Sequence, residues 1–340
     1  MALAFRGGMV LALAALASFL LAFYAVEFAI EGVSNKASGP GGVILYKPNK
    51  TVSFGGPGGE YFATRSVNSL GFMDMERVVE KPAGVKRIAI VGDSFVEAHQ
   101  VPREKAFPAL LESELEGVEV LAFGREALGT LEEEIVIERF VLQFKPDVIV
   151  LAFVPNDPAD SFYYNRRASS PFSFLSNTRL YRILEGQVAF YFTSRLFNDV
   201  TPWLKSYEST GAAYPEVREG WALARGSIQR IKERAAAENA SLVVAYVPEP
   251  LEFGGLYESM ALKAFPFLDG KLDLGKPRAE LEKMASELGV CLIDFSDALS
   301  KEEQKGQRTY YLEDLHLNEL GNEAAARALK VGLASCGSLD

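Results

Sequence analysis

Ser94 stands where a nucleophile is expected. It follows the apolar, β-branched run 87–91 in the sequence Gly-Asp-Ser, so it lies at a predicted turn from a strand into a helix. A serine at such a turn exposes its hydroxyl, and its backbone N–H lies near a helix N-terminus that favours an oxyanion. The same position is also typical of a helix N-cap, which is a purely structural role.

Two further polar or small residues end predicted strands. Gly124 follows the run 118–123, and a glycine there lets a backbone N–H approach a substrate closely. Asn156 follows the run 147–153, and its amide is a candidate donor to a developing oxyanion. Each of the two residues is also an ordinary turn former.

His316 is one of two histidines in the chain. Asp314 lies two residues before it and Glu313 three residues before it, and a carboxylate beside a histidine orients and charge-stabilises an imidazole that takes a serine proton. A histidine in a loop is also commonly incidental. The other histidine, His99, lies five residues after Ser94, where a surface or supporting role is favoured over that of a base.

The surrounding elements predict an α/β fold. Strand-like apolar runs alternate with helical patterns, which is typical of βαβ units and predicts a parallel sheet covered on both faces, a three-layer α/β/α sandwich. Ligands bind at the carboxyl edge of such a sheet. The four sequence blocks that contain Ser94, Gly124, Asn156 and His316 all fall at this edge. The predicted strands are 87–91, 118–123, 147–153, 241–247 and 290–295, and the predicted helices are 106–115, 131–144, 217–239, 277–288 and 320–333.

Taken in order, the four blocks resemble those of the SGNH (GDSL) hydrolase superfamily. The match covers residues 87–333, about three quarters of the chain. The stretch GDSFVEAHQVPREKAFPALLE and the upstream segment NSLGF at 68–72 are similar to envelope-anchored bacterial members. The resemblance implies the flavodoxin-like SGNH fold, with a central, mainly parallel sheet of five strands.

The resemblance also implies roles for the site residues. Ser94 is the expected nucleophile and His316 the base, and the oxyanion hole combines the Ser94 and Gly124 N–H groups with the Asn156 side chain. Many members place the acid three residues before the histidine, at Glu313 here, but a D-x-H spacing also occurs, and we prefer Asp314. At position 122, where relatives often have asparagine, this chain has alanine. No cofactor and no metal is implied.

Composition excludes some partners. The net charge is −10 and no basic run appears, which argues against nucleic acid because phosphate binding needs clustered Lys and Arg. The two cysteines, Cys291 and Cys336, fit either one disulfide between a late strand and the last helix or two small buried side chains. With two histidines they do not readily supply a structural zinc site.

The N-terminal region predicts a membrane anchor. Residues 9–26 carry no charge, so we expect a short cytoplasmic tail at 1–8 and a transmembrane signal anchor at 9–30, with a cleaved signal peptide as the alternative. Arg6 before the run and Glu27 after it favour an external catalytic body. The expected location is therefore the cell membrane, single-pass, with the catalytic domain extracytoplasmic.

The rest of the chain divides into an extension and a catalytic domain. Residues 31–84 are expected to form a linker, mainly at 34–42, and an N-terminal extension, in which the glycine cluster 55–59 is a surface turn. Residues 85–340 form the predicted hydrolase domain. Its aromatic-rich insertion at 158–216 is a cap over the site, a surface that meets a membrane or partner, or a plain helical insertion.

These features predict a serine esterase that hydrolyses an acyl ester through an acyl-enzyme on Ser94. The expected partner is an acyl ester on an envelope glycan or a lipid. One alternative is an O-acyltransferase for envelope polysaccharide, since only the acceptor of the acyl group differs. Another is an envelope binding module that keeps the fold without catalysis.

Overall fold

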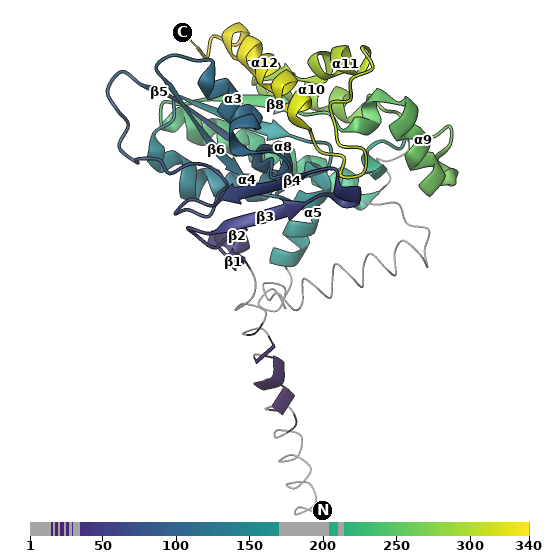
Figure 1. Cartoon of the computed structure of the whole chain (residues 1–340), viewed down its shortest axis with the longest axis horizontal. Coiled ribbons are helices and arrows are strands. Elements are labelled where there is room, and N and C mark those ends of the chain that lie inside the picture. The colour runs from purple at the N-terminus through teal and green to yellow at the C-terminus, as the bar shows by residue number, and fades with distance from the viewer. Residues whose placement is uncertain are drawn as a thin grey trace, which may run out of the picture.

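The computed structural model describes residues 35–169, 204–209 and 214–339, together with scattered positions between 15 and 29. Its centre is a sheet of five parallel strands in the order β6-β5-β7-β8-β9 (Figure 1). The strands are β5 (Lys86–Gly92), β6 (Val118–Gly124), β7 (Val148–Phe153), β8 (Ser241–Tyr246) and β9 (Cys291–Asp294). All five strands predicted from the sequence are therefore confirmed, as is their parallel pairing.

Two apolar layers cover the faces of the sheet, because successive side chains of each strand point to opposite faces. On β5, Ala89 and Val91 pack into one layer, and Ile88 and Ile90 pack into the other. The first layer is completed by α4 (Thr130–Val136), α8 (Pro215–Ala237) and α10 (Lys276–Leu288). The second is completed by α2 (Ser94–Glu97), α3 (Phe107–Ser113), α11 (Ser296–Glu303) and α12 (Glu319–Ser335). The predicted three-layer sandwich is confirmed.

The predicted helices are present, and the structure adds others. The predicted helix at 131–144 is α4 followed by a π-helical turn (Ile137–Val141) and a 3-10 turn (Leu142–Phe144). The helices α5 (Asp157–Ala168), α9 (Gly255–Ala264) and α11 (Ser296–Glu303) have no counterpart in the prediction. The first of these lies at the start of the predicted aromatic insertion. Most of that insertion, residues 170–203 and 210–213, lies outside the described residues.

The N-terminal extension is more ordered than expected. We predicted a flexible linker at 34–42, and for the described residues of this segment that prediction is wrong. Residues Lys36–Ser38 form β1, which pairs with β2 (Ile44–Tyr46), because a tight turn containing two glycines at positive φ closes the hairpin. A second hairpin follows, made of β3 (Thr51–Gly55) and β4 (Phe62–Ser66), with the glycine cluster at its tip.

The predicted anchor at 9–30 lies largely outside the described residues. Within the part of the chain that the structure does describe, no helix combines the length and the apolar character needed to cross a membrane.

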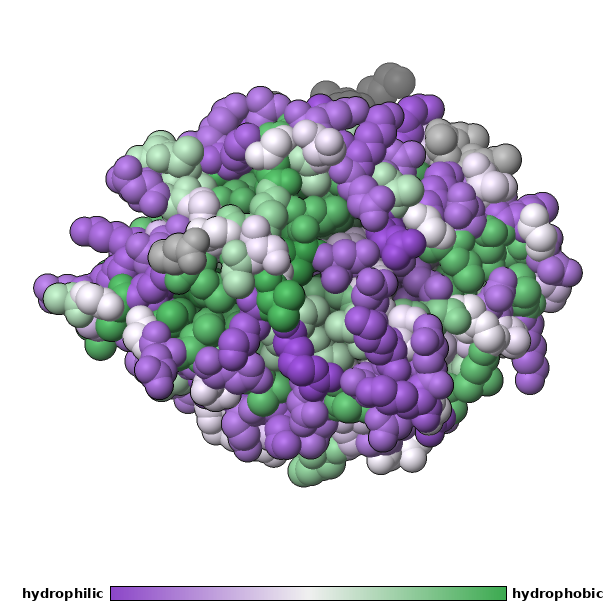
Figure 2. Space-filling model, turned by 90° about the horizontal axis from the view of Figure 1, so that it is seen from above, coloured by the Kyte–Doolittle hydropathy of each residue, from purple (hydrophilic) through white to green (hydrophobic). Residues whose placement is uncertain are grey.

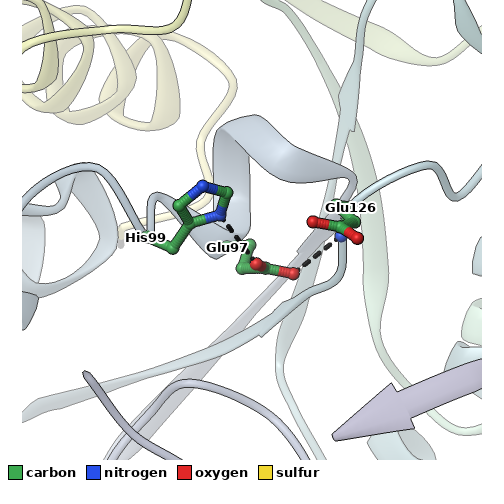
Figure 3. Close-up of side chains that lie close together, drawn as sticks. All are labelled: Glu97, His99 and Glu126. Carbon is green, nitrogen blue, oxygen red and sulfur yellow. Dashed lines mark hydrogen bonds and ion pairs between the residues drawn. The ribbon is translucent and has the colours of Figure 1, made fainter. Parts of the chain in front are cut away.

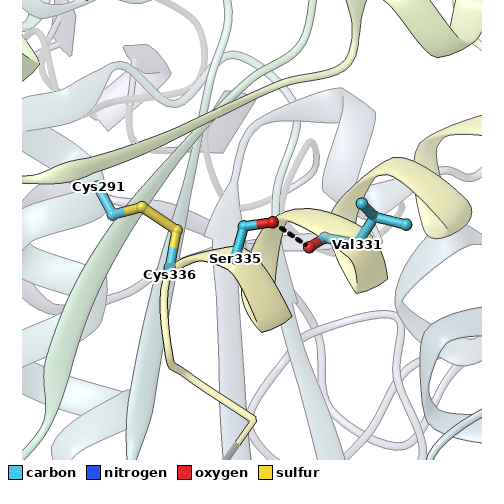
Figure 4. The surroundings of a disulfide bond; sticks show 4 residues. All are labelled: Cys291, Val331, Ser335 and Cys336. Atoms are coloured by element: carbon cyan, nitrogen blue, oxygen red, sulfur yellow. Dashed lines mark hydrogen bonds between the residues drawn. A yellow bond between two sulfur atoms is a disulfide. The ribbon is translucent and has the colours of Figure 1, made fainter.

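A disulfide joins the last strand to the last helix (Figure 4). Cys291 begins β9 and Cys336 directly follows α12, with 6.1 Å between their Cα atoms. This settles the alternative that the sequence left open. Closing a loop of this length stabilises a fold by about 4 kcal/mol in the chain-entropy account of disulfides.

Candidate active site

A hydrogen-bonded chain of three side chains lies at the carboxyl edge of the sheet. The Ser94 Oγ is 2.8 Å from the His316 Nε2, and the His316 Nδ1 is 2.7 Å from the Asp314 Oδ1. The structure therefore brings together the nucleophile, base and acid that the sequence predicts. Glu313, the other candidate acid, is exposed and makes no such contact.

Ser94 owes its position to the end of β5. Asp93 is the N-cap of α2, and its carboxylate accepts a hydrogen bond from the Phe95 backbone N–H at 2.9 Å, which fixes the turn. The strand order places this turn at the switch point between β5 and β7, where open α/β sheets bind ligands. Ser94 is thus the first residue of a helix that starts at the expected edge of the sheet.

The acid and base share one tight turn before α12. Leu315, between Asp314 and His316, has a φ of +67°, the left-handed region that a branched side chain rarely adopts. This turn allows two residues only two positions apart to face each other. His316 is anchored through its carbonyl, which accepts a hydrogen bond from the Tyr311 N–H at 2.9 Å.

The electrostatics of the pair suit proton transfer. Burial lowers the pKa of His316, but the hydrogen bond and charge of Asp314 outweigh it, so the His316 pKa lies above its ordinary value of 6.5. Burial raises the pKa of Asp314, yet the hydrogen bond from His316 and its charge bring that pKa below the ordinary value of 3.8. Asp314 therefore stays ionised and stabilises a protonated imidazole.

Asn156 also reaches the site. It follows β7 and lines the same cavity as Ser94. In this structure its amide nitrogen lies 2.8 Å from the Asp160 Oδ2 and 3.4 Å from the Asp93 Oδ2. An amide that served an oxyanion would have to turn one of these N–H groups toward the substrate.

Gly124 is placed differently from the other predicted residues. It is buried at the end of β6 and does not line the cavity, whereas Ala127, three residues later, does. A Cβ on Gly124 would lie 2.0 Å from the Glu97 backbone nitrogen. The absence of a side chain therefore lets α2 pack directly on β6, and its predicted role as an oxyanion donor stays a prediction.

A cavity of about 500 Å³ opens beside Ser94 and His316. One part of its wall is acidic, formed by Asp93, Asp160 and Glu249, and burial raises the pKa of Asp160 to about 7 and that of Glu249 to about 8. The opposite part is apolar. It consists of Leu204, Pro250, Leu251, Tyr257, Met260, Ala261, Ala264 and Phe265.

Glu97, His99 and Glu126 lie close together on the other side of α2 (Figure 3). The Glu97 carboxylate accepts hydrogen bonds from the Tyr46 hydroxyl at 2.9 Å, the Arg125 guanidinium at 3.2 Å and the Glu126 backbone N–H at 2.7 Å, and it contacts the His99 Nδ1 at 2.9 Å. These partners outweigh burial and lower the Glu97 pKa to about 2. The cluster is a satisfied ion-pair network, and His99 supports α2 rather than acting on Ser94.

Sequence reasoning missed several residues of the site. Tyr61 and Gln100 both donate to the Asp314 carboxylate, at 2.9 and 3.1 Å. The acidic part of the cavity wall was also not foreseen, nor was the apolar wall built by α9. Of these, only Gln100 had a signal in the sequence, since it lies within the stretch that resembles envelope-anchored hydrolases.

The fold and the site together define the chemistry that is available. A Ser-His-Asp chain of hydrogen bonds at the carboxyl edge of a five-stranded parallel sheet is an arrangement that can activate a serine for acyl transfer.

The comparisons with known proteins find similar solved structures at low sequence identity. No protein-family model and no curated protein matches the sequence. Among solved structures the chain is similar to LAE5, an α/β hydrolase enzyme from the metagenome of Lake Arreo, with 13% identity, a TM-score of 0.42, and coverage of 76% of this chain and 98% of that one. It is also similar to a variant of Axe2, an acetyl-xylooligosaccharide esterase from Geobacillus, with 11% identity, a TM-score of 0.44, and coverage of 75% of this chain and 96% of that one. A lipolytic protein of the G-D-S-L family from Veillonella parvula has 14% identity and a TM-score of 0.40, with coverage of 72% of this chain and 96% of that one.

Proposed function

We propose that this protein is a membrane-anchored, extracytoplasmic serine esterase that hydrolyses an acyl ester through an acyl-enzyme on Ser94. The observation that carries the proposal is the continuous hydrogen-bonded path from the Ser94 Oγ through His316 to Asp314, beside an open cavity.

The mechanism follows from this geometry. His316 takes the Ser94 proton through Nε2 while Asp314 stabilises the imidazolium, and the Ser94 oxygen attacks the ester carbonyl. The Ser94 N–H, the Gly124 N–H and the Asn156 amide are the proposed donors to the tetrahedral oxyanion, and removing one such donor costs about 10²–10³ in rate. His316 then returns the proton to the leaving alcohol, and water releases the acyl group by the same steps.

The proposed location rests on two observations. The uncharged run at 9–26 is long enough for a signal anchor. The disulfide between Cys291 and Cys336 is typical of a domain in an oxidising compartment. Both support a catalytic body on the outer side of the membrane, where the substrate would be an acyl ester on an envelope glycan or a lipid.

The test uses the purified full-length chain in detergent with p-nitrophenyl esters of increasing acyl length. We expect steady turnover by the wild type, loss of that turnover in Ser94→Ala, and labelling of Ser94 by a fluorophosphonate. Preference for acetate supports a glycan deacetylase, and preference for longer chains supports a lipid esterase that uses the apolar wall of the cavity.

Two other outcomes would overturn the proposal. A burst of p-nitrophenol that stalls until a glycan acceptor is added would identify an O-acyltransferase. No turnover together with no labelling of Ser94 would leave a binding module with this fold.

A further inference from the structure

The β3–β4 hairpin of the N-terminal extension contacts the loop that carries the acid and base. Glu60, at its tip, accepts hydrogen bonds from three successive backbone N–H groups, those of Leu312 at 2.6 Å, Glu313 at 3.0 Å and Asp314 at 3.0 Å. One carboxylate therefore holds the backbone of the turn on which Asp314 is placed. A charged acceptor makes these bonds stronger than neutral ones.

The next residue of the hairpin contacts the acid itself. The Tyr61 hydroxyl donates to the Asp314 Oδ2 at 2.9 Å, while the Gln100 amide donates to the Oδ1 at 3.1 Å and His316 approaches the same Oδ1. Tyr61 thus occupies the oxygen that does not face the imidazole. With both oxygens bonded, the carboxylate has one orientation in which its Oδ1 faces the His316 Nδ1.

The other end of the hairpin holds the nucleophile's helix. Arg65 on β4 is 3% exposed, and its guanidinium donates to the carbonyls of Ala98 at 2.5 Å and Val101 at 3.2 Å, directly after α2. Phe54 on β3 stacks on His99, with 4.3 Å between the ring centroids. One hairpin therefore contacts both the segment that follows Ser94 and the loop that carries Asp314.

The glycine cluster at 55–59 explains how the tip comes so close. Gly58 has a φ of +57°, and a Cβ there would lie 3.1 Å from the Glu313 Oε2. A side chain at this position would strain the turn and crowd the Glu313 carboxylate. The cluster, which the sequence suggests is only a surface turn, is the element that lets Glu60 reach the backbone of 312–314.

We propose that Glu60 and Tyr61 are positioning residues of the active site, which hold Asp314 in line with His316 from outside the catalytic domain. The proposal rests on the proposed esterase function for its catalytic consequence. The geometry predicts that loss of either contact lets the Asp314 loop move, so that His316 is oriented for proton transfer less often while the cavity stays intact.

The kinetic test compares Glu60→Gln and Tyr61→Phe with the wild type in the full-length chain, using p-nitrophenyl acetate. We expect kcat to fall about tenfold in Tyr61→Phe, which loses one bond to a charged group, and at least as much in Glu60→Gln, with KM changed less than about twofold. The matched controls are Tyr311→Phe and Glu313→Gln. Tyr311 packs beside Tyr61 with ring centroids 5.0 Å apart, and the exposed Glu313 adjoins Asp314.

A spectroscopic test does not depend on turnover. The chain has two histidines, so the Nδ1 proton of His316 is readily assigned in histidine-labelled protein with His99→Gln as reference. We expect its downfield, hydrogen-bonded resonance in the wild type and in both controls, and its broadening or loss in Glu60→Gln and Tyr61→Phe. A loss of stability that leaves the chain folded would not remove this resonance.

The outcomes separate the two proposals. If kcat and the Nδ1 resonance of both variants match the wild type, or if the controls lose as much as the variants, the positioning role is wrong. If the wild type lacks esterase activity but the resonance still depends on Glu60 and Tyr61, the esterase function fails and the positioning role stands.

Discussion

Two carboxylates precede His316, and the backbone decides which of them serves it. Leu315 in the left-handed conformation turns Asp314 back onto the imidazole and leaves Glu313 in solvent. A spacing of two residues therefore suffices to bring a carboxylate onto the imidazole. The side chains alone do not distinguish the two acids; the turn between them does.

We therefore expect Asp314→Asn to lower kcat by about 10³–10⁴, because an amide at this position neither holds the right imidazole tautomer nor stabilises its charge. Glu313→Gln is the matched control and should change kcat less than about twofold. Steady-state rates with p-nitrophenyl acetate measure both. A small loss in both variants would show that either carboxylate can act as the acid.

The pH dependence of the reaction follows from His316. Its pKa is raised because the hydrogen bond and charge of Asp314 outweigh burial, and only the neutral imidazole can accept the Ser94 proton. The rate constant kcat/KM should thus fall on the acid side with an apparent pKa above 6.5. In Asp314→Asn this limb should move to lower pH. A profile that is flat from pH 8 down to about pH 5 would contradict the assignment of His316 as base.

The residues that sequence reasoning found share a property. Ser94, Asn156 and His316 each follow an apolar run or precede a helix, so local patterns mark both the residue and the edge of the sheet where it lies. Glu60 and Tyr61 lack such a mark. They follow a glycine cluster on a separate hairpin, and their importance arises from contacts with residues about 250 positions away.

At the scale of elements, the packing of α2 on β6 depends on one glycine. A Cβ on Gly124 would overlap the Glu97 backbone nitrogen, so Gly124→Ala should displace α2 and with it Ser94. We expect a loss of unfolding free energy of about 3 kcal/mol or more, as in severe overpacking, and a strong loss of turnover. Denaturant unfolding and esterase rates measure the two effects.

Gly226→Ala is a suitable control for that change. It lies in the middle of α8, and its Cβ would meet only the end of the flexible Arg230 side chain, at 3.1 Å. Alanine is the better helix former, so stability should be unchanged or slightly higher. A Gly124→Ala variant as stable as this control would mean that α2 has room to move.

The elements themselves were predictable to different degrees. The parallel strands and the long helices follow from apolar periodicity, and all five strands of the sheet were placed correctly from the sequence. Strand β1 and the turn after it were mistaken for a linker because residues 34–42 are mostly small or polar and the pairing of β1 depends on the glycine turn. The short helix α2 and the cavity wall formed by α9 depend on tertiary contacts rather than on local pattern.

Across the whole molecule, acidic side chains lie in the interior as well as on the surface. Figure 2 shows one face, on which hydrophilic side chains surround hydrophobic patches. The net charge of the chain is −10. Among the carboxyls in or next to the cavity, burial raises the pKa of Asp160 to about 7, of Glu249 to about 8 and of Glu252 to about 7. Their protonation sets how stability depends on pH.

These groups bind protons more tightly in the folded chain than in the unfolded one, where their pKa values are 3.8 for Asp and 4.5 for Glu. Their contribution is therefore complete below about pH 4 and is lost as the pH rises toward about 8. Glu97 has the opposite effect, because its pKa is lowered from 4.5 to about 2 in the folded chain. Its contribution to stability is complete above pH 4.5 and is lost as the pH falls from 4.5 toward 2.

Thermal unfolding should consequently show a maximum Tm at acidic pH, about 4 to 5, and a decline toward pH 8. Asp160→Asn should flatten the decline, because the amide cannot ionise inside the cavity. A Tm that rises steadily from pH 5 to pH 8 in the wild type would contradict the raised pKa values.

The contact between Glu60 and the loop 312–314 has a consequence for how the protein acquires its activity. It closes a loop of about 250 residues, and such distant pairings form late in folding because the chain between them must first be ordered. Neighbouring strands of the central sheet are joined by shorter stretches of chain and can pair first. We therefore expect the sheet to form during refolding before the acid and the base are aligned.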